Sequence, residues 1–152
     1  MILQRIKPIV ILMAMVVVAC GAQASAPDVI MTSSIGLNPN PVTVGSNLVV
    51  TYTVNDGGTA AAPLSHTKIQ VKQGSSSTTL VQVTNNTPAL AVGASTTDTV
   101  TIPIPAGAAP GGYTVYVILD FDNKIGQTTA GQANDIYQTT TSALTCTAKK
   151  LS

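Results

Sequence analysis

Apolar and polar residues alternate along several short stretches of the chain, and a period of two predicts β-strands. The clearest stretch places Leu48, Val50, Tyr52 and Val54 on one face and mostly Thr and Val on the other. Such alternation directs one set of side chains to a core and the other to solvent. No helical period appears after Cys20. The strands predicted in this way cover residues 28–37, 48–54, 67–71, 80–83, 99–104, 113–119 and 136–141.

Prolines and turn residues indicate how these strands are arranged. Pro103 has no backbone N–H, so the strand over 99–104 is expected at a sheet edge. The strand over 113–119 is apolar on both faces, which favours a central position. Tyr113 at its start is either a tyrosine corner, whose hydroxyl bonds to nearby backbone, or an ordinary core residue. About seven short strands separated by turns are typical of an all-β, antiparallel two-sheet β-sandwich.

The first residues have the pattern of an export signal rather than of a folded element. Arg5 and Lys7 precede eleven apolar residues from Ile9 to Ala19. A membrane-spanning helix needs about 20 apolar residues, so a permanent anchor is the weaker interpretation. Cleavage is expected before Cys20, whose sulfur would then carry lipid, or before Ser25. The predicted organisation is therefore a signal peptide over 1–24, a β-sandwich over 25–141 and a C-terminal tail over 142–152.

The composition narrows the function classes. Only 9% of the 152 residues are charged, against about 25% in typical proteins, and Glu is absent. So few charges argue against nucleic-acid binding, which needs clustered Lys and Arg. After cleavage five Lys remain against six Asp, a net charge of −1. Cys146 would then be free in the predicted tail, available to pair with another chain or remaining an ordinary reduced thiol.

Candidate chemistry is sparse. One His and no Glu leave a serine nucleophile without an evident base and orienting partner. Zinc would need more His or Cys ligands than the chain offers. Calcium is the one ion to consider, because oxygen ligands could come from adjacent loops, although capped turns explain the same residues more simply. We expect no metal, no cofactor and no enzymatic activity. The residues concerned are Asp120, Asp122, Asn123 and Asp135.

Several short motifs follow one another in an order that is informative as a set. Pro27-Asp28-Val29-Ile30 comes first, residues 44–55 and 90–97 follow, and Gly112-Tyr113-Thr114-Val115 precedes Asp120 and Asn123. Over residues 27–138 this order resembles the bacterial cell-adhesion-related domain known as CARDB. The resemblance implies an immunoglobulin-like extracellular module, usually one unit of a larger surface protein. The acidic end with paired Asn that is usual in the family is replaced here by residues 131–135, which puts an ion-binding role in doubt.

Three function classes follow. The first is a non-catalytic surface module for adhesion or protein interaction, tethered by lipid or secreted, with a protein or glycan partner. The second is a fibre subunit that self-associates when a sheet edge accepts a strand from the next copy. The third, for which we find no catalytic constellation, is a small hydrolase. An outward row on the strand over 67–71, formed by His66, Lys68, Gln70 and Lys72, is expected to be a solvated face.

Overall fold

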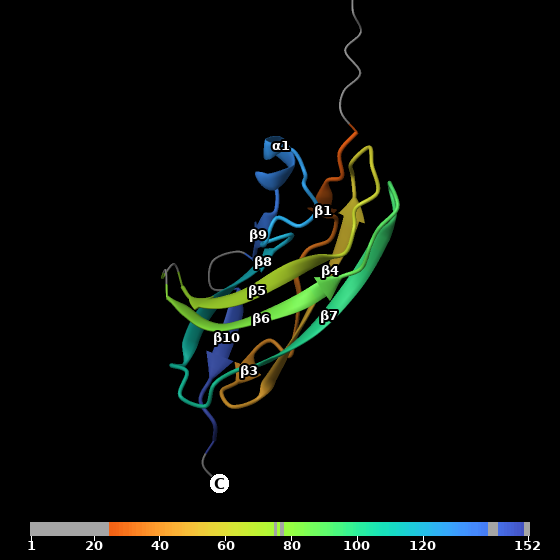
Figure 1. The fold of residues 1–152 in the computed structure, drawn as a ribbon. Coiled ribbons are helices and arrows are strands. Elements are labelled where there is room, and N and C mark those ends of the chain that lie inside the picture. Colours follow the sequence, from red (N-terminus) through yellow and green to blue (C-terminus); the bar gives the residue numbers. More distant parts are fainter. Residues whose placement is uncertain (1–24, 75, 77, 140–142, 151–152) are drawn as a thin grey trace, which may run out of the picture.

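The computed structural model describes residues 25–74, 76, 78–139 and 143–150. These residues form two sheets that pack face to face (Figure 1). Helix α1 (Thr129–Gln132) lies at the end where the described chain begins, and the C-terminal residues lie at the opposite end. No helix in the described part is long and apolar enough to cross a membrane. The prediction of an all-β sandwich is therefore confirmed.

The first sheet is built around β4 (Asn47–Asp56), which has neighbours on both sides. One side pairs along its whole length with β7 (Ser95–Pro103). The other side pairs with two short strands, β1 (Val29–Met31) and β2 (Gly36–Asn38). Within the described residues β7 pairs with β4 and with no other strand, so the edge position predicted from its proline is confirmed.

The predicted strand over 28–37 is two strands rather than one. Between β1 and β2, the hydroxyl of Ser33 accepts the backbone N–H of Thr53 at 2.8 Å. A side chain thus replaces a backbone carbonyl in the ladder, and the strand pattern is interrupted there. The prolines at 39 and 41 then separate β2 from β3 (Val42–Thr43), which joins the other sheet.

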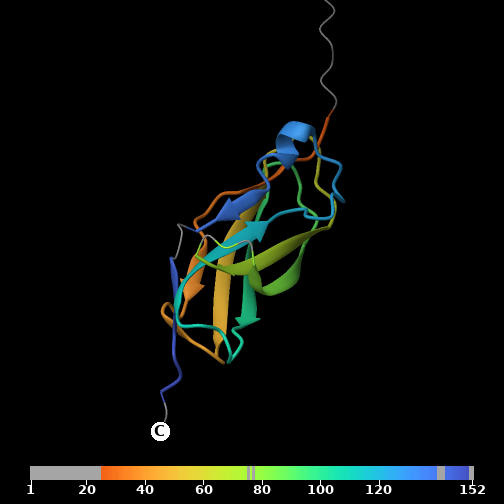
Figure 2. The same ribbon diagram turned by 90° about the vertical axis from the view of Figure 1, so that its left-hand side faces the viewer.

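The second sheet is centred on β8, which confirms the central position predicted for the strand over 113–119. One side of β8 pairs with β5, which in turn pairs with β6. The other side pairs with β9 near one end of β8 and with β10 near the other (Figure 2). Strand β3 closes the sheet by pairing in parallel with β10. The bounds of these strands are β5 (Ser65–Gln73), β6 (Thr79–Thr87), β8 (Gly111–Ile118), β9 (Ile136–Gln138) and β10 (Leu144–Thr147).

Two sequence predictions are corrected near the C-terminus. The segment over 142–152 is not simply a tail, because it contains β10, with Leu144 and Cys146 buried against the core. Two apolar residues alternating with Thr form too short a pattern to identify a strand. Helix α1 was not predicted because it is a single turn, started by the Thr128 hydroxyl, which accepts the N–H of Gly131.

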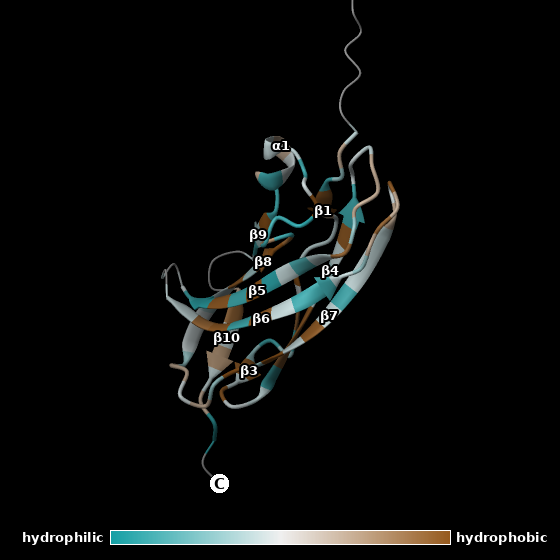
Figure 3. Cartoon of the chain, in the orientation of Figure 1, coloured by the Kyte–Doolittle hydropathy of each residue, from teal (hydrophilic) through white to brown (hydrophobic). Residues whose placement is uncertain are grey.

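The core consists of the inward residues of both sheets. Along β4 and β5, buried positions alternate with more exposed ones. Hydrophobic segments, drawn in brown, recur along the strands of both sheets (Figure 3). Val, Ile and Leu dominate the interior, and each fully buried side chain of this size contributes about 1.5–3 kcal/mol to folding. The largest fully buried side chains are Tyr52, Tyr113, Leu48, Ile69, Ile102, Ile104, Leu119 and Leu144.

Candidate functional site

The loop between β8 and β9 contains the residues considered as ion ligands, and Asp120 shapes its first turn. Its two carboxylate oxygens accept the backbone N–H groups of Lys124 at 2.8 Å and Ile125 at 3.3 Å. Asp120 and Asn123 both have left-handed backbone conformations, with φ of 38° and 52°. Burial raises the pKa of Asp120, and the two N–H donors oppose that shift. Asp120 therefore acts as the organiser of a tight turn.

Asp122 and Asn123 point to different partners. The Asp122 carboxylate lies 2.7 Å from Nδ1 of His66 on β5. The side-chain oxygen of Asn123 accepts a hydrogen bond from Gln132 in α1 at 2.9 Å. These contacts attach the first turn of the loop to the start of β5 on one side and to α1 on the other.

Asp135 is buried at the end of the same loop, 6% exposed. The side-chain amide of Gln127 donates to one of its carboxylate oxygens, while the other is buried without a hydrogen-bond partner. Burial raises the pKa of Asp135 to about 6, and the negative charges of Asp120 and Asp28 add to the shift. The side-chain Oε1 of Gln127 accepts the N–H of Val29 at 3.2 Å, which ties the loop to β1.

The four predicted ligands thus form hydrogen bonds with separate partners, although Asp120 and Asp135 lie close enough for their charges to interact. Across residues 25–74, 76, 78–139 and 143–150, no group of three or more His, Cys, Asp or Glu side chains is placed to hold a metal ion. Sequence reasoning missed Gln127, whose hydrogen bond with Val29 joins residues 98 positions apart and leaves no local signal.

The outward row on β5 makes contacts with neighbouring strands and with the loop that follows β8. Besides the His66 pair, the amino group of Lys68 lies 4.1 Å from the ring centroid of Phe121, and that of Lys72 lies 4.8 Å from the ring centroid of Tyr116. Gln70 donates to Gln82 on β6 at 2.9 Å. These contacts make the row part of the outer face of the sheet.

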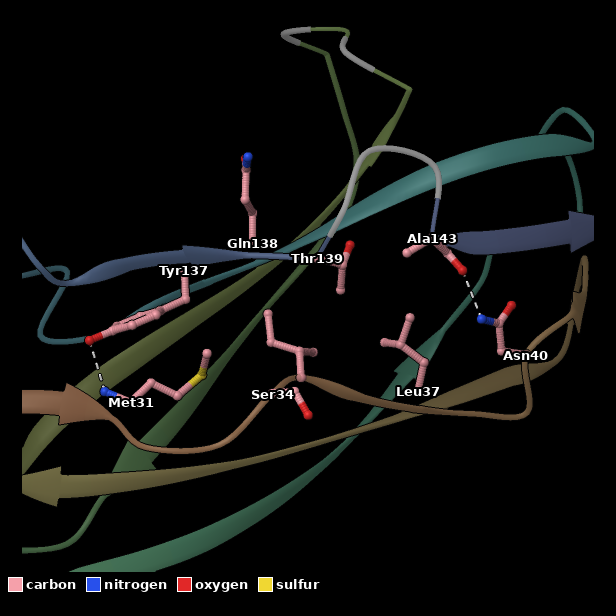
Figure 4. Close-up of a pocket in the computed structure, with 9 residues that line it drawn as sticks. Met31, Ser34, Leu37, Asn40, Tyr137, Gln138, Thr139 and Ala143 are labelled. Carbon is pink, nitrogen blue, oxygen red and sulfur yellow. Dashed lines mark hydrogen bonds between the residues drawn. The ribbon is translucent and has the colours of Figure 1, made fainter.

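A groove of about 480 Å³ opens between the two sheets, where the segment joining β1 to β2 faces β9 (Figure 4). Met31 and Leu37 supply apolar wall, with Tyr137 opposite. The Tyr137 hydroxyl accepts the N–H of Met31 at 2.9 Å, and Asn40 donates to the carbonyl of Ala143 at 2.8 Å. The described residues that line the groove include no carboxylate, histidine or cysteine, and their polar side chains are the hydroxyls of Ser34, Tyr137 and Thr139 and the amides of Asn40 and Gln138.

The opposite side of the sandwich presents two strand edges, β7 and β6. The N–H of Ile104 donates to Ser46 and the N–H of Asp56 donates to Ala94, so even-numbered residues of β7 bond toward β4. Bonds alternate along an antiparallel strand, so the odd-numbered residues of β7 direct their backbone groups away from β4. Those with both an N–H and a carbonyl are Ser95, Thr97, Thr99 and Thr101.

Strand β6 has the same kind of edge. The carbonyl of His66 accepts the N–H of Phe121, so even-numbered residues of β5 bond on the side of β8 and odd-numbered ones on the side of β6. In the register of β5 with β6, Gln82, Thr84 and Asn86 then direct their backbone groups outward. All three side chains are exposed and uncharged. Among the described strands, β6 and β7 each have a partner on one side only.

Three further predicted residues can be placed against the structure. Tyr113 is 1% exposed, and its hydroxyl donates to the carbonyl of Ala109 at 2.7 Å, the geometry of a tyrosine corner. Cys146 is a buried thiol rather than a tail residue, and burial raises its pKa. Cys20 and the rest of the predicted signal peptide lie outside the described residues.

Comparisons with known proteins agree with this architecture. The CARDB domain of the PF1109 protein from Pyrococcus furiosus, crystallised in complex with di-metal ions, is similar with a TM-score of 0.51 and 16% identity, covering 84% of this chain and 97% of that one. Its solution structure gives a TM-score of 0.51 and 18% identity over 82% and 96% of the two chains. Among proteins with curated functions none matches. The CARDB family model matches residues 26–138, most of the sequence, and the chain therefore belongs to the CARDB family.

Proposed function

We propose that this protein is a non-catalytic extracytoplasmic module for cell-surface adhesion or protein interaction, tethered by lipid on Cys20 or secreted. Membership of a family of adhesion-related, immunoglobulin-like modules supports this proposal. The contacts of the polar side chains also support it, because the side chains considered for chemistry bond within the protein instead. These contacts are the Asp120 turn, the Asp135–Gln127 pair and the His66–Asp122 pair.

The uncharged edges of β6 and β7 carry the proposal. An exposed edge can bind an extended segment of a partner through backbone hydrogen bonds, with side chains giving specificity. Natural edges are commonly blocked by outward Lys or Pro. Here the outward residues of both edges carry no charge, and Pro103 stands at the last position of β7.

Adhesion is tested by coating beads with the exported protein and counting their retention on cells of the native host. Thr84→Lys places a charge on the β6 edge, and Thr99→Lys places one on the β7 edge. We expect at least one of them to reduce retention about tenfold or more. The double variant Lys68→Ser with Lys72→Ser should retain wild-type binding. Full retention by both edge variants, or loss in the Lys double variant, would contradict the role of the edges.

The tether is tested on protein recovered from its native host. We expect an intact mass that corresponds to an acylated Cys20 at the first position and recovery with membranes. Cys20→Ser should then move the protein to the soluble fraction. Unmodified protein that starts at Ser25 in the medium would establish the secreted form and exclude the tether.

A fibre subunit is the second candidate, because β6 and β7 are different edges. Pairing β6 of one copy with β7 of the next is heterologous, and such contacts propagate unless the rotation closes a ring. In that case either Thr84→Lys or Thr99→Lys would cap growth and abolish filaments in electron micrographs. Filaments that persist in either variant would remove this candidate.

A hydrolase has the least support. His66 and Asp122 resemble a base and its orienting carboxylate, but in the described residues no Ser or Thr hydroxyl bonds to His66. A nucleophile activated by this pair is therefore missing from its surroundings.

A further inference from the structure

We propose that two copies of this chain associate through β7, antiparallel about a two-fold axis that passes beside Thr99. This inference rests on the proposed function in one respect, since it assigns a partner to one of the two edges. It leaves the β6 edge for the partner on the cell surface.

The hydrogen-bonding pattern of β7 is suited to pairing with itself. The bonds at both ends of the strand place an N–H and a carbonyl of four residues on the side away from β4, namely Ser95, Thr97, Thr99 and Thr101. An antiparallel neighbour must present the same alternation, and a second β7 does so. The contact is then isologous and closes as a dimer.

Full overlap of the two strands selects one register. Thr99 is the middle residue of the nine in β7, so it lies opposite its own counterpart. Thr97 then faces Thr101, and Ser95 faces Pro103. Pro103 lacks an N–H but keeps its carbonyl, which can accept from Ser95. Because Pro103 stands at the strand end, its missing N–H removes few hydrogen bonds from the ladder between the two copies.

The charge on β7 favours the same register. Asp98 is the one charged residue of the strand, and its side chain lies beside Tyr52 and Asn85 in the seam between the sheets. With Thr99 on the axis, Asp98 faces Val100 of the second copy. The register that instead centres the axis on Asp98 opposes two carboxylates directly, which is unfavourable.

The outer face next to β7 is also neutral. The hydroxyl of Thr97 lies 2.9 Å from that of Thr53, and the hydroxyl of Thr99 lies 3.4 Å from that of Thr51. Two copies joined at β7 would therefore extend a continuous band of threonines across the interface without bringing like charges together.

The β6 edge is less suited to self-pairing. Its neighbour β5 carries Lys68 and Lys72 on the same outer face, with Lys68 directly opposite Thr84. Two copies joined at β6 would bring these positive rows toward each other. The β5–β6 register also shifts between Val71 and Lys72, and such irregularities discourage edge pairing.

The experiment measures molar mass against concentration by analytical ultracentrifugation of the exported protein. We expect the wild type to be dimeric, and Thr99→Lys, which opposes two Lys across the axis, to weaken the dimer more than about tenfold. Equimolar Thr99→Lys and Thr99→Asp should restore a mixed dimer, because residue 99 faces itself. Thr84→Lys, the matched exposed position on β6, should remain dimeric.

Circular dichroism and thermal unfolding check that the Thr99→Lys variant is folded. Both should match the wild type, because Thr99 is exposed on an outer face. A wild type that is monomeric at every concentration tested, a dimeric Thr99→Lys variant, or failure of the mixed pair to associate would each overturn the proposal. Bead retention separates the two claims. A monomeric wild type that still binds cells refutes the dimer and leaves the proposed function intact. A dimeric wild type that fails to bind cells supports the dimer and refutes the proposed function.

Discussion

The Tyr113 hydroxyl donates a 2.7 Å hydrogen bond to the carbonyl of Ala109, four residues earlier in the chain. Ala109 belongs to the connection that leaves edge strand β7 in one sheet, and Tyr113 lies in β8 at the centre of the other. The bond therefore fixes the crossing between the sheets and helps to hold the β7 edge in place.

Tyr113→Phe should destabilise the fold without changing its shape. The variant keeps the buried ring and removes one hydrogen bond, which predicts a loss of about 1–2 kcal/mol in the free energy of unfolding. Urea unfolding measures this loss. Tyr116→Phe is the matched control, because that ring lies on the outer face against Lys72, and we expect less than about 0.5 kcal/mol. Equal effects of the two changes would show that the tyrosine corner contributes nothing.

Asp135 should make stability depend on pH. Its folded-state pKa of about 6 lies above the ordinary value of 3.8, so between these values the folded state binds more protons than the unfolded state. This carboxyl therefore supports folding most at low pH, and its contribution falls as pH rises from about 4 to about 6. At pH 7.5 Asp135→Asn should be more stable than wild type by up to about 3 kcal/mol.

The measurement is urea unfolding of both proteins at several pH values from 4 to 7.5. The difference between variant and wild type should grow across that range and level off above about pH 6. A difference that is constant with pH would mean that Asp135 titrates normally in the folded protein.

The sequence predicts the fold better than it predicts the site, for physical reasons. Alternation along β4 and β5 is a local property, as are the missing N–H of Pro103 and the apolar faces of β8, and all three indicated the correct place in the sandwich. The partners of Asp122 and Asp135 are set by the packing of distant segments. Nothing near Asp122 in the chain indicates His66, and nothing near Val29 indicates Gln127.

The environment of Cys146 is another feature that the local sequence did not predict correctly. A thiol among Thr residues suggested an accessible tail, but pairing with β8 and β3 turns it inward to 2% exposure. We predict that Ellman's reagent reacts slowly with Cys146 in the native state and fully in guanidinium, and that exported protein shows no interchain disulfide.

A variant with Cys146→Ser and Thr145→Cys provides the control, because Thr145 is the exposed neighbour on the same strand. It should react rapidly without denaturant. Rapid reaction of native Cys146 would instead indicate that β10 detaches readily from the sheet.

Truncation tests whether β10 belongs to the folding unit. Ending the chain after Thr141 removes Leu144 and Cys146 from the core and leaves β3 without its partner strand. We expect a loss of at least about 3 kcal/mol, enough to unfold a domain of ordinary stability. Ending it after Ala148 removes residues 149–152, of which Lys149 and Lys150 are exposed, keeps β10, and should leave the unfolding midpoint unchanged. If the shorter chain unfolded at the same denaturant concentration as the longer one, β10 would be an appendage rather than a strand on which the sandwich depends.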